Sequence, residues 1–210
     1  MSSWRIVERP ILGVAVSCLI FTGLPSGMSG QAVPGEVQNA VRILDEEAHY
    51  VLPDSTLSDV IVRLNRTRLA GAGEMMAQGL TEYRIQPAWR PTGAGGRCRV
   101  SDLILNVHVR VTLPSWPGMD ARPAEEQASW RLIEDAIRSH EYQHRDLTVD
   151  AAELLADALV QLRTRGCRAL ERAFAGEMAL ADQRLREAHD QLDRDTPDRL
   201  AVGRRPAGPP

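Results

Sequence analysis

The sequence predicts an α+β fold in which a small antiparallel or mixed sheet packs on a long helix and on a second, C-terminal helix. Two patterns support this prediction. Apolar and polar residues alternate along residues 103–113, as in a strand with one buried face. After Ala124, apolar residues recur at spacings of three and four, as on an amphipathic helix. A chain of 210 residues can form one ordinary domain with a hydrophobic core.

The N-terminal segment has the composition of a signal peptide. Arg5 and Arg9 precede an apolar run at residues 11–24, which is followed by small residues. The run is short for a membrane-spanning helix, so export is favoured over anchoring. We therefore expect residues 1–32 to be removed, leaving a periplasmic or secreted protein without a stable membrane anchor. The alternative is a buried N-terminal helix.

The first elements after this segment are short. Residues 48–52 are predicted to form a strand, and Thr56 with Asp59 resembles a capping box that opens a helix through Leu64. Small residues at 71–79 indicate a loop.

Two β-rich runs follow, at residues 83–89 and 98–113, with a turn expected at residues 91–96. The residues expected on the buried face of the second run are Leu103, Leu105, Val107, Val109 and Val111. We expect this second run to lie over the long helix, where its backbone could hold an extended substrate.

The C-terminal half is predicted to contain the two helices. The inward stripe of the first is expected to comprise Trp130, Ile133, Ile137, His140, His144, Leu147, Ala151, Leu154, Leu155, Ala158 and Leu162. Gly166 is expected to end or kink this helix, and the second helix to run from about Arg168 to Leu192. We place the folded domain at residues 33–203 and a disordered tail at 204–210.

Cysteine usage fits export. Signal cleavage would remove Cys18 and leave Cys98 and Cys167, an even pair that predicts one disulfide. Two buried free thiols are the alternative. A zinc site built from these cysteines is disfavoured, because neither belongs to a C-x-x-C pair.

The most informative motif is His140-Glu141-Tyr142-Gln143-His144. Histidines four residues apart on a helix point the same way and can bind one zinc ion. Glu141 lies about 100° round the helix, where it can act as the general base of a metallohydrolase without being a ligand. The alternative is a pair of hydrogen-bonded core histidines beside a surface glutamate.

The third zinc ligand is ambiguous in the sequence. Asp150 has the metzincin spacing, but Leu147 replaces the glycine that such sites need for the chain to turn back. Glu171 or Glu177, on the following helix, could serve as in a gluzincin, although such glutamates are more often solvated helix residues.

From about residue 49 to residue 203, the chain resembles a bacterial family catalogued as domain of unknown function 922 and described as predicted secreted zinc-dependent proteases. The matching segments are residues 81–89, 96–100, 113–116, Trp130 leading into 140–144, and Cys167 with Leu170 and Glu171. The resemblance implies a periplasmic or secreted location, a Cys98–Cys167 disulfide and a protease activity that is itself inferred from the zinc motif. With the helix that carries this motif, we expect the fold to be zincin-like.

One segment departs from the family pattern. Family members commonly end in Tyr-Asp-x-x-Thr-x-His-Gly, and here the segment has Asp193 and Thr196 in place but Asp198 where the histidine would be. A carboxylate can bind zinc, so Asp198 is our first candidate for the third ligand, with Asp193 and Glu171 as alternatives. The other interpretation is a loss of metal affinity.

These observations predict an exported zinc-dependent metallohydrolase that acts on a peptide or protein. The alternative is a catalytically impaired zinc-binding or interaction protein of the cell envelope, and a third possibility is a helical scaffold for a partner. Tyr50 and Tyr83 are candidate oxyanion donors, whereas Tyr142 should point away from the metal. A net charge of -3 and 4% aromatic residues argue against nucleic acid as a partner.

Overall fold

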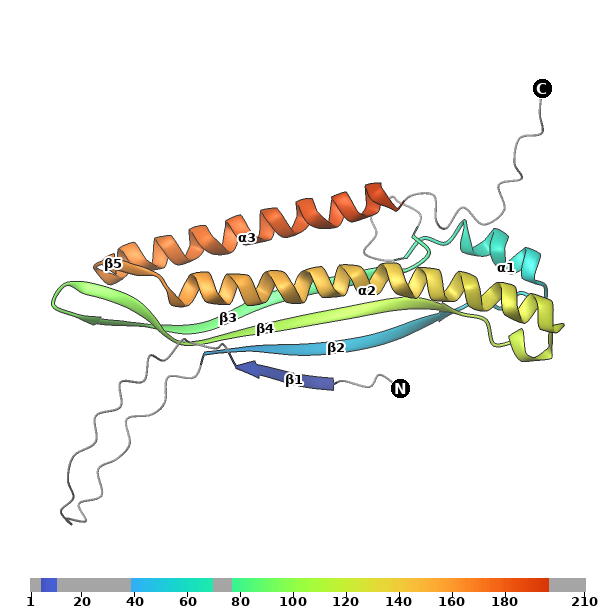
Figure 1. Ribbon diagram of the computed structural model, residues 1–210, viewed down its shortest axis with the longest axis horizontal. Coiled ribbons are helices and arrows are strands. Elements are labelled where there is room, and N and C mark those ends of the chain that lie inside the picture. Colours follow the sequence, from blue (N-terminus) through green and yellow to red (C-terminus); the bar gives the residue numbers. More distant parts are fainter. Residues whose placement is uncertain (1–4, 11–38, 70–76, 197–210) are drawn as a thin grey trace, which may run out of the picture.

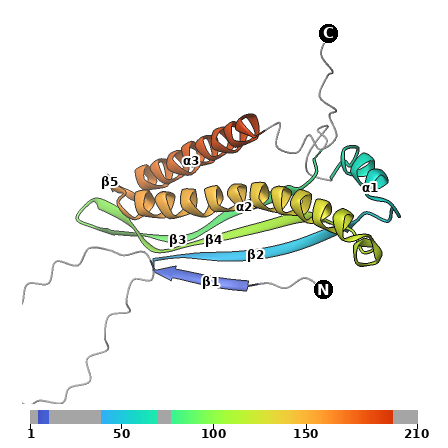
Figure 2. The ribbon, with the colours of Figure 1, turned by 45° about the vertical axis from the view of Figure 1, so that its right-hand side comes forward.

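The computed structural model describes residues 5–10, 39–69 and 77–196. The architecture is α+β, as predicted: a mixed sheet lies on one side, α2 (Ala124–Val160) runs along it, and α3 (Cys167–Asp195) returns beside α2 (Figure 1). Both long helices remain on the same side of the sheet in the second view (Figure 2).

The sheet has the strand order β1-β2-β4-β3. β2 (Ala40–Val51) pairs in parallel with β4 (Arg97–Ser115), while β3 (Leu80–Ala94) pairs with β4 in the antiparallel direction. β1 (Arg5–Pro10) is antiparallel to β2, and the short β5 (Arg163–Arg165) pairs with the start of β4. β4 is therefore the central strand, and β2 and β3 are its direct neighbours.

The predicted alternation along β4 is confirmed. Its buried residues include Leu103, Leu105, Val107, Val109 and Val111. These side chains form the core with the buried face of α2, because the period of two residues places all of them on one side of the sheet.

The strand boundaries differ from the predictions. β2 begins eight residues before the predicted strand (48 − 40 = 8), because it pairs with β4 along its whole length despite its many charged residues. The turn between β3 and β4 is limited to Gly95 and Gly96, whose φ values of 58° and 76° suit glycine. Pro91 belongs to β3, where an edge strand tolerates a missing N–H donor.

The predicted capping box is confirmed at the start of α1 (Leu57–Leu64). The backbone N–H of Asp59 donates to Thr56 Oγ1 over 3.2 Å. The following loop, expected at residues 71–79, lies mostly outside the described residues. A 3-10 turn, η1 (Met119–Ala121), leads from β4 toward α2.

The bounds of α3 are close to the prediction, but α2 ends at Val160 rather than at Gly166, because residues 163–165 form β5 and pair with β4. The inward stripe of α2 is also rotated relative to the prediction. The buried residues are Trp130, Ile133, Ile137, Glu141, His144, Thr148, Val149, Ala152, Leu155, Ala156 and Leu159. Leu154 is 71% exposed, and Ala158 is also exposed. The sheet and α3 cover two adjoining sides of α2, so the 3.6-residue period alone did not decide which row of residues is buried.

The predicted disulfide between Cys98 and Cys167 is present and joins the start of β4 to the start of α3. Gly166, with φ of 81°, immediately precedes α3, and its N–H donates to Gly96 O over 2.9 Å. The rings of Trp89 and Phe174 stack nearby, with centroids 4.2 Å apart. One end of the α2–α3 pair is thus held to the sheet by a covalent bond and by apolar packing.

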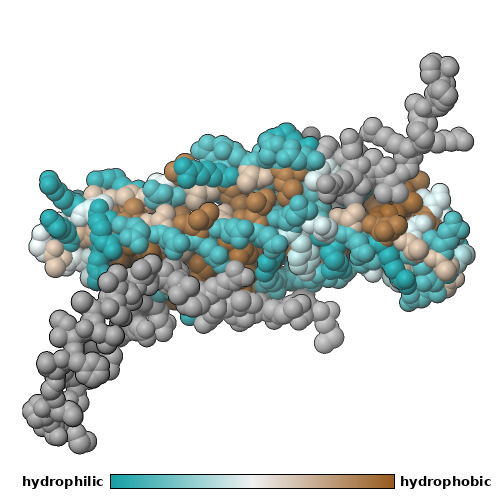
Figure 3. Space-filling view, viewed as in Figure 1, coloured by the Kyte–Doolittle hydropathy of each residue, from teal (hydrophilic) through white to brown (hydrophobic). Residues whose placement is uncertain are grey.

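Within the described ranges, no helix combines the length and apolar character needed to cross a membrane. The predicted signal peptide falls outside these ranges except for residues 5–10, and the predicted tail at 204–210 falls outside them entirely. Hydrophobic patches remain on the visible surface among the polar side chains (Figure 3). Exposed large apolar residues on the long helices are Leu132, Leu154 and Leu180.

Candidate metal centre

His140 and His144 lie one turn apart on α2, and their rings face each other. The ring centroids are 4.7 Å apart, and the two Nε2 atoms are separated by 3.1 Å. His144 is 8% exposed, and His140 is only partly buried, at the edge of the inward stripe. The helical spacing predicted from the motif therefore brings the two nitrogens to one point.

α3 supplies a carboxylate at the same point. Asp193 Oδ1 lies 3.1 Å from His140 Nε2 and 2.9 Å from His144 Nε2. Because α3 runs back along α2, a residue near its C-terminal end meets the middle of α2. Among the described residues, His140, His144 and Asp193 form a group whose potential ligand atoms all lie within 4.8 Å of one another.

The second ring nitrogen of His140 contacts Thr196. The Thr196 hydroxyl donates to the carbonyl oxygen of Leu192 over 2.6 Å and lies 3.1 Å from His140 Nδ1. With its single proton engaged, the hydroxyl accepts from His140 Nδ1–H. Asp193 and Thr196 are the two residues of this segment that match the family pattern, and they contact opposite nitrogens of the same ring.

The second ring nitrogen of His144 contacts a histidine that sequence reasoning missed. His189, on α3, has its Nδ1 2.7 Å from His144 Nδ1 and its Nε2 3.3 Å from the hydroxyl of Thr148. The ring of Tyr83 stacks on His189 with centroids 5.0 Å apart. Burial lowers the pKa of His189 to about 4, with the nearby His144 acting in the same direction. His189 is therefore neutral at pH 7, and burial lowers the pKa of His144 as well.

A sequence signal for His189 does exist. Leu185, His189, Asp193 and Thr196 are spaced by four, four and three residues, which places them on one face of a helix. This spacing identifies His189 as a site residue only when this face of α3 is known to contact residues 140–144 of α2.

Glu141 is buried rather than exposed, at 5%. The Thr81 hydroxyl lies 2.8 Å from its Oε2 and 2.9 Å from its backbone carbonyl oxygen. Gly79 leaves room for the side chain, because a Cβ at position 79 would lie 2.6 Å from Glu141 Cγ. Burial raises the pKa of Glu141 to about 7; the hydrogen bond from Thr81 opposes this shift, and the charge of Asp193 adds to it.

The donor set suits zinc. Zinc in proteins binds imidazole nitrogen and carboxylate oxygen at about 2.0–2.2 Å, so two atoms on one ion are at most ~4.3 Å apart. The three candidate atoms lie 2.9–3.1 Å from one another. Two imidazole nitrogens and one carboxylate oxygen could therefore hold a single zinc ion.

The remaining predicted ligands do not meet these histidines in the described part of the chain. Glu171 is 22 residues before Asp193 on the same helix (193 − 171 = 22), about 33 Å along its axis. Glu177 is 16 residues before it (193 − 177 = 16), about 24 Å away. Asp150 is exposed on α2, and Asp198 lies outside the described residues.

The three tyrosines have other partners. Tyr50 donates to Gln78 O over 2.7 Å, and Tyr83 stacks on His189. Tyr142 donates to Glu47 Oε2 over 2.7 Å, which agrees with the expectation that it points away from the two histidines.

The expectation that the strand at 103–113 could hold a substrate is wrong. β4 lies between β2 and β3, so its backbone groups are paired on both sides. In the described sheet, the edge strand that lies beside the candidate metal centre is β3, whose Thr81 contacts Glu141.

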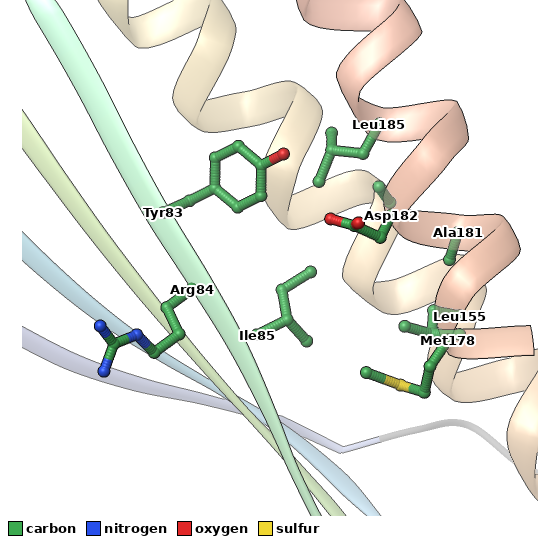
Figure 4. A pocket seen from close by; sticks show the side chains of 9 residues that line it. Tyr83, Arg84, Ile85, Leu155, Met178, Ala181, Asp182 and Leu185 are labelled. Carbon is green, nitrogen blue, oxygen red and sulfur yellow. The ribbon is translucent and has the colours of Figure 1, made fainter. Parts of the chain in front are cut away.

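A cavity of about 300 Å³ adjoins this edge. Tyr83 and Ile85 from β3 face Leu155, Met178, Ala181 and Leu185 from the helices, while Arg84 points away (Figure 4). The cavity is mainly apolar, with Asp182 as its acidic residue. Tyr83 forms part of its lining and also touches His189, so the cavity and the candidate centre are neighbours.

Comparisons with known proteins give one match. The sequence model of a family described as "Bacterial protein of unknown function (DUF922)" matches residues 47–199, more than half of the chain. No curated protein and no solved structure matches. The matched stretch contains every residue of the candidate centre.

Proposed function

We propose that this chain, which belongs to the DUF922 family of bacterial proteins, is an exported zincin-like hydrolase that uses zinc to cleave peptide bonds. The membership confirms the resemblance found in the sequence. The family description names no activity, so the proposal rests on the geometry of this chain.

One observation supports the metal more than any other. His140 Nε2, His144 Nε2 and Asp193 Oδ1 converge within 2.9–3.1 Å, while each imidazole has its other nitrogen engaged by Thr196 or His189. If both Nδ1 atoms hold protons, the two Nε2 atoms and the carboxylate present only lone pairs to each other. Three acceptors at this separation repel one another unless a cation lies among them.

The chemistry divides between the metal and Glu141. Zinc bound by these residues supplies Lewis acidity, which lowers the pKa of water and polarises a carbonyl group. Thr81 holds Glu141 Oε2, so we assign proton transfer to Oε1. The oxygen of water adds to the amide carbon as its proton passes to Oε1; that proton then moves to the amide nitrogen as the C–N bond breaks.

The surroundings of the centre favour a peptide over a small substrate. Thr81, Tyr83 and Ile85 lie on one face of β3 and contact, in turn, Glu141, His189 and the cavity. An extended peptide added to the outer edge of β3 would pass Glu141 and reach the cavity about four residues later, at ~3.3 Å per residue. The cavity would accept an apolar side chain.

The disulfide supports the proposed location. Disulfides persist in oxidising compartments and are rare in the cytosol, and the Cys98–Cys167 bond therefore agrees with export by the predicted signal peptide.

The second candidate function is a zinc-binding or interaction protein of the envelope without turnover. Its support is Asp198, which stands where the family pattern has a histidine. Both functions require the metal, and only the first requires Glu141 as a base.

The test combines metal content with peptide hydrolysis on the mature protein. We expect one zinc ion per chain in the wild type and less than a tenth of that in His144→Ala. Glu141→Gln should retain zinc and lose peptide hydrolysis by at least about 100-fold, as expected for a general base. Zinc-free wild-type protein at pH 7 after incubation with zinc would refute both functions. If both the wild type and Glu141→Gln bind zinc and hydrolyse peptides equally, or not at all, the enzyme function is refuted and the zinc-binding function remains.

A substrate library tests the cavity. Ala181→Phe should fill it and lower kcat/KM for peptides with a large apolar residue about four positions from the cleaved bond, while zinc content stays unchanged. The matched control is Ala158→Phe on the exposed side of α2.

A further inference from the structure

The side chain of His189 touches the candidate centre without belonging to its ligand set, and this places it in a distinct role. Its ring lies between His144 and Thr148, on the opposite side of His144 from Asp193. Tyr83 covers one face of the ring.

The direction of the hydrogen bonds can be followed from Thr148. Its hydroxyl is fully buried and donates to the carbonyl oxygen of His144 over 3.0 Å. Since a hydroxyl has one proton, Thr148 Oγ1 accepts from His189 Nε2–H. His189 Nδ1 then has no proton and accepts from His144 Nδ1–H at 2.7 Å.

With these hydrogen bonds, His144 Nε2 carries no proton and has a free lone pair. That atom faces Asp193 Oδ1 at 2.9 Å and His140 Nε2 at 3.1 Å, which is the proposed metal position. Partners of this kind fix the orientation and tautomer of metal-binding histidines, and their loss commonly costs 10- to 100-fold in metal affinity.

We infer that His189 is a positioning residue which, together with Thr148, holds His144 in the Nδ1–H tautomer and thereby prepares its Nε2 for zinc. The inference rests on the proposed metal site and adds to it a residue that lies outside the H-E-x-x-H motif, 45 positions after His144.

The opposite direction is the competing arrangement. If Thr148 donated to His189 Nε2, His189 Nδ1–H would donate to His144 Nδ1, and His144 Nε2–H would donate to Asp193. His144 would then be a hydrogen-bonded histidine with no lone pair for a metal, which is the structural alternative considered for the motif.

Two variants of the full mature protein separate packing from hydrogen bonding. His189→Phe keeps an aromatic ring against Tyr83 but removes both ring nitrogens. His189→Asn gives up the stacking but can place an amide oxygen near the former Nδ1 position, where it can accept from His144. His108→Phe is the control, because His108 lies on the face of β4 that points away from α2.

Zinc affinity is measured by competition with a chelator of known affinity, using zinc alone as the probe. We expect a 10- to 100-fold loss in His189→Phe, recovery of most of that loss in His189→Asn, and no change in His108→Phe. The metal-free His189→Phe protein should unfold at the same temperature as the metal-free wild type. In the zinc-bound wild type, nitrogen-15 NMR should detect scalar coupling across the His144 Nδ1–H···Nδ1 His189 hydrogen bond.

Several results would overturn the inference. Wild-type affinity in His189→Phe would overturn it while leaving the proposed metal site intact. A loss far beyond 100-fold would make His189 a direct ligand instead. An equal loss in His189→Phe and His189→Asn, with both metal-free variants unfolding at lower temperature, would reduce its role to packing. A wild type that binds no zinc would remove both the inference and the proposed function.

Discussion

The two ends of the α2–α3 pair are held together in different ways. At one end, the Cys98–Cys167 disulfide, β5 and the stacked rings of Trp89 and Phe174 join α3 to the sheet. At the other end, α3 meets α2 through His189 and Asp193, with Thr196 beyond them. Cys167 and Asp193 are 26 residues apart on one helix (193 − 167 = 26), about 39 Å along its axis.

This difference suggests a division of labour along one helix pair. A covalent bond and apolar packing stabilise the fold regardless of metal. With both histidines in the proposed Nδ1–H tautomer, the polar end gathers three acceptor atoms that repel one another, an arrangement that costs stability without a cation. A protein can retain this group of acceptor atoms when other contacts stabilise the fold. Bound zinc would then provide a second link between α3 and α2.

The largest effect should follow from removing the covalent end. Replacing Cys98 and Cys167 by serine opens a loop that spans 69 residues, which should lower the free energy of unfolding by about 4 kcal/mol in the chain-entropy model. Urea unfolding measures this loss. Zinc affinity below the unfolding transition should stay within about threefold of the wild type, and its collapse would show that the two ends are not independent.

Zinc itself should strengthen the other end. At a free zinc concentration 100 times the dissociation constant, the free energy of unfolding should rise by about 2.7 kcal/mol, as measured by chemical unfolding with and without a chelator. Asp193→Asn should abolish most of this gain, and because it removes one of the repelling acceptors it should not lower the stability of the metal-free protein. An equal gain in the variant would remove Asp193 from the ligand set.

Crowding the base should affect catalysis without affecting metal binding. A Cβ at position 79 would lie 2.6–2.9 Å from three atoms of Glu141, so Gly79→Ala should displace that side chain and cost roughly 1–3 kcal/mol of stability. We expect peptide hydrolysis to fall at least about tenfold, with zinc content preserved. Gly176→Ala is the control: a Cβ there meets nothing within 4 Å, and helix propensity predicts a gain of up to about 1 kcal/mol.

The smallest effect should come from Thr196. Thr196→Val removes the acceptor for His140 Nδ1–H and should weaken zinc binding about tenfold, or about 1.4 kcal/mol, in chelator competition. Thr164→Val makes the same change at the disulfide end, where Thr164 donates to Gly166 O, and should leave zinc affinity unaltered. Similar losses in both variants would contradict the separation of the two ends.

Much of the fold could be predicted because its signals are local. The alternation along β4, the cap at Thr56 and the periodicity of the long helices depend on near neighbours in the chain. The boundaries of β2 and the inward row of α2 could not be predicted in this way. They depend on pairing with β4 and on packing against α3, and both are contacts between segments far apart in sequence.

The candidate centre likewise has some features that the local sequence specifies and others that depend on tertiary contacts. The sequence by itself determined that His140 and His144 share a helix face with Glu141 beside them, since a spacing of four residues is one helical turn. It also identified Asp193 as one of several possible third ligands and paired Cys98 with Cys167.

Only the tertiary structure decided which carboxylate meets the histidines, that Glu141 is buried against Thr81 and Gly79, and that His189 and Thr148 complete a chain behind His144. The physical reason is the register between α2 and α3. A shift of one helical turn would move every residue of α3 by about 5.4 Å relative to α2, and no local pattern in either helix specifies that register.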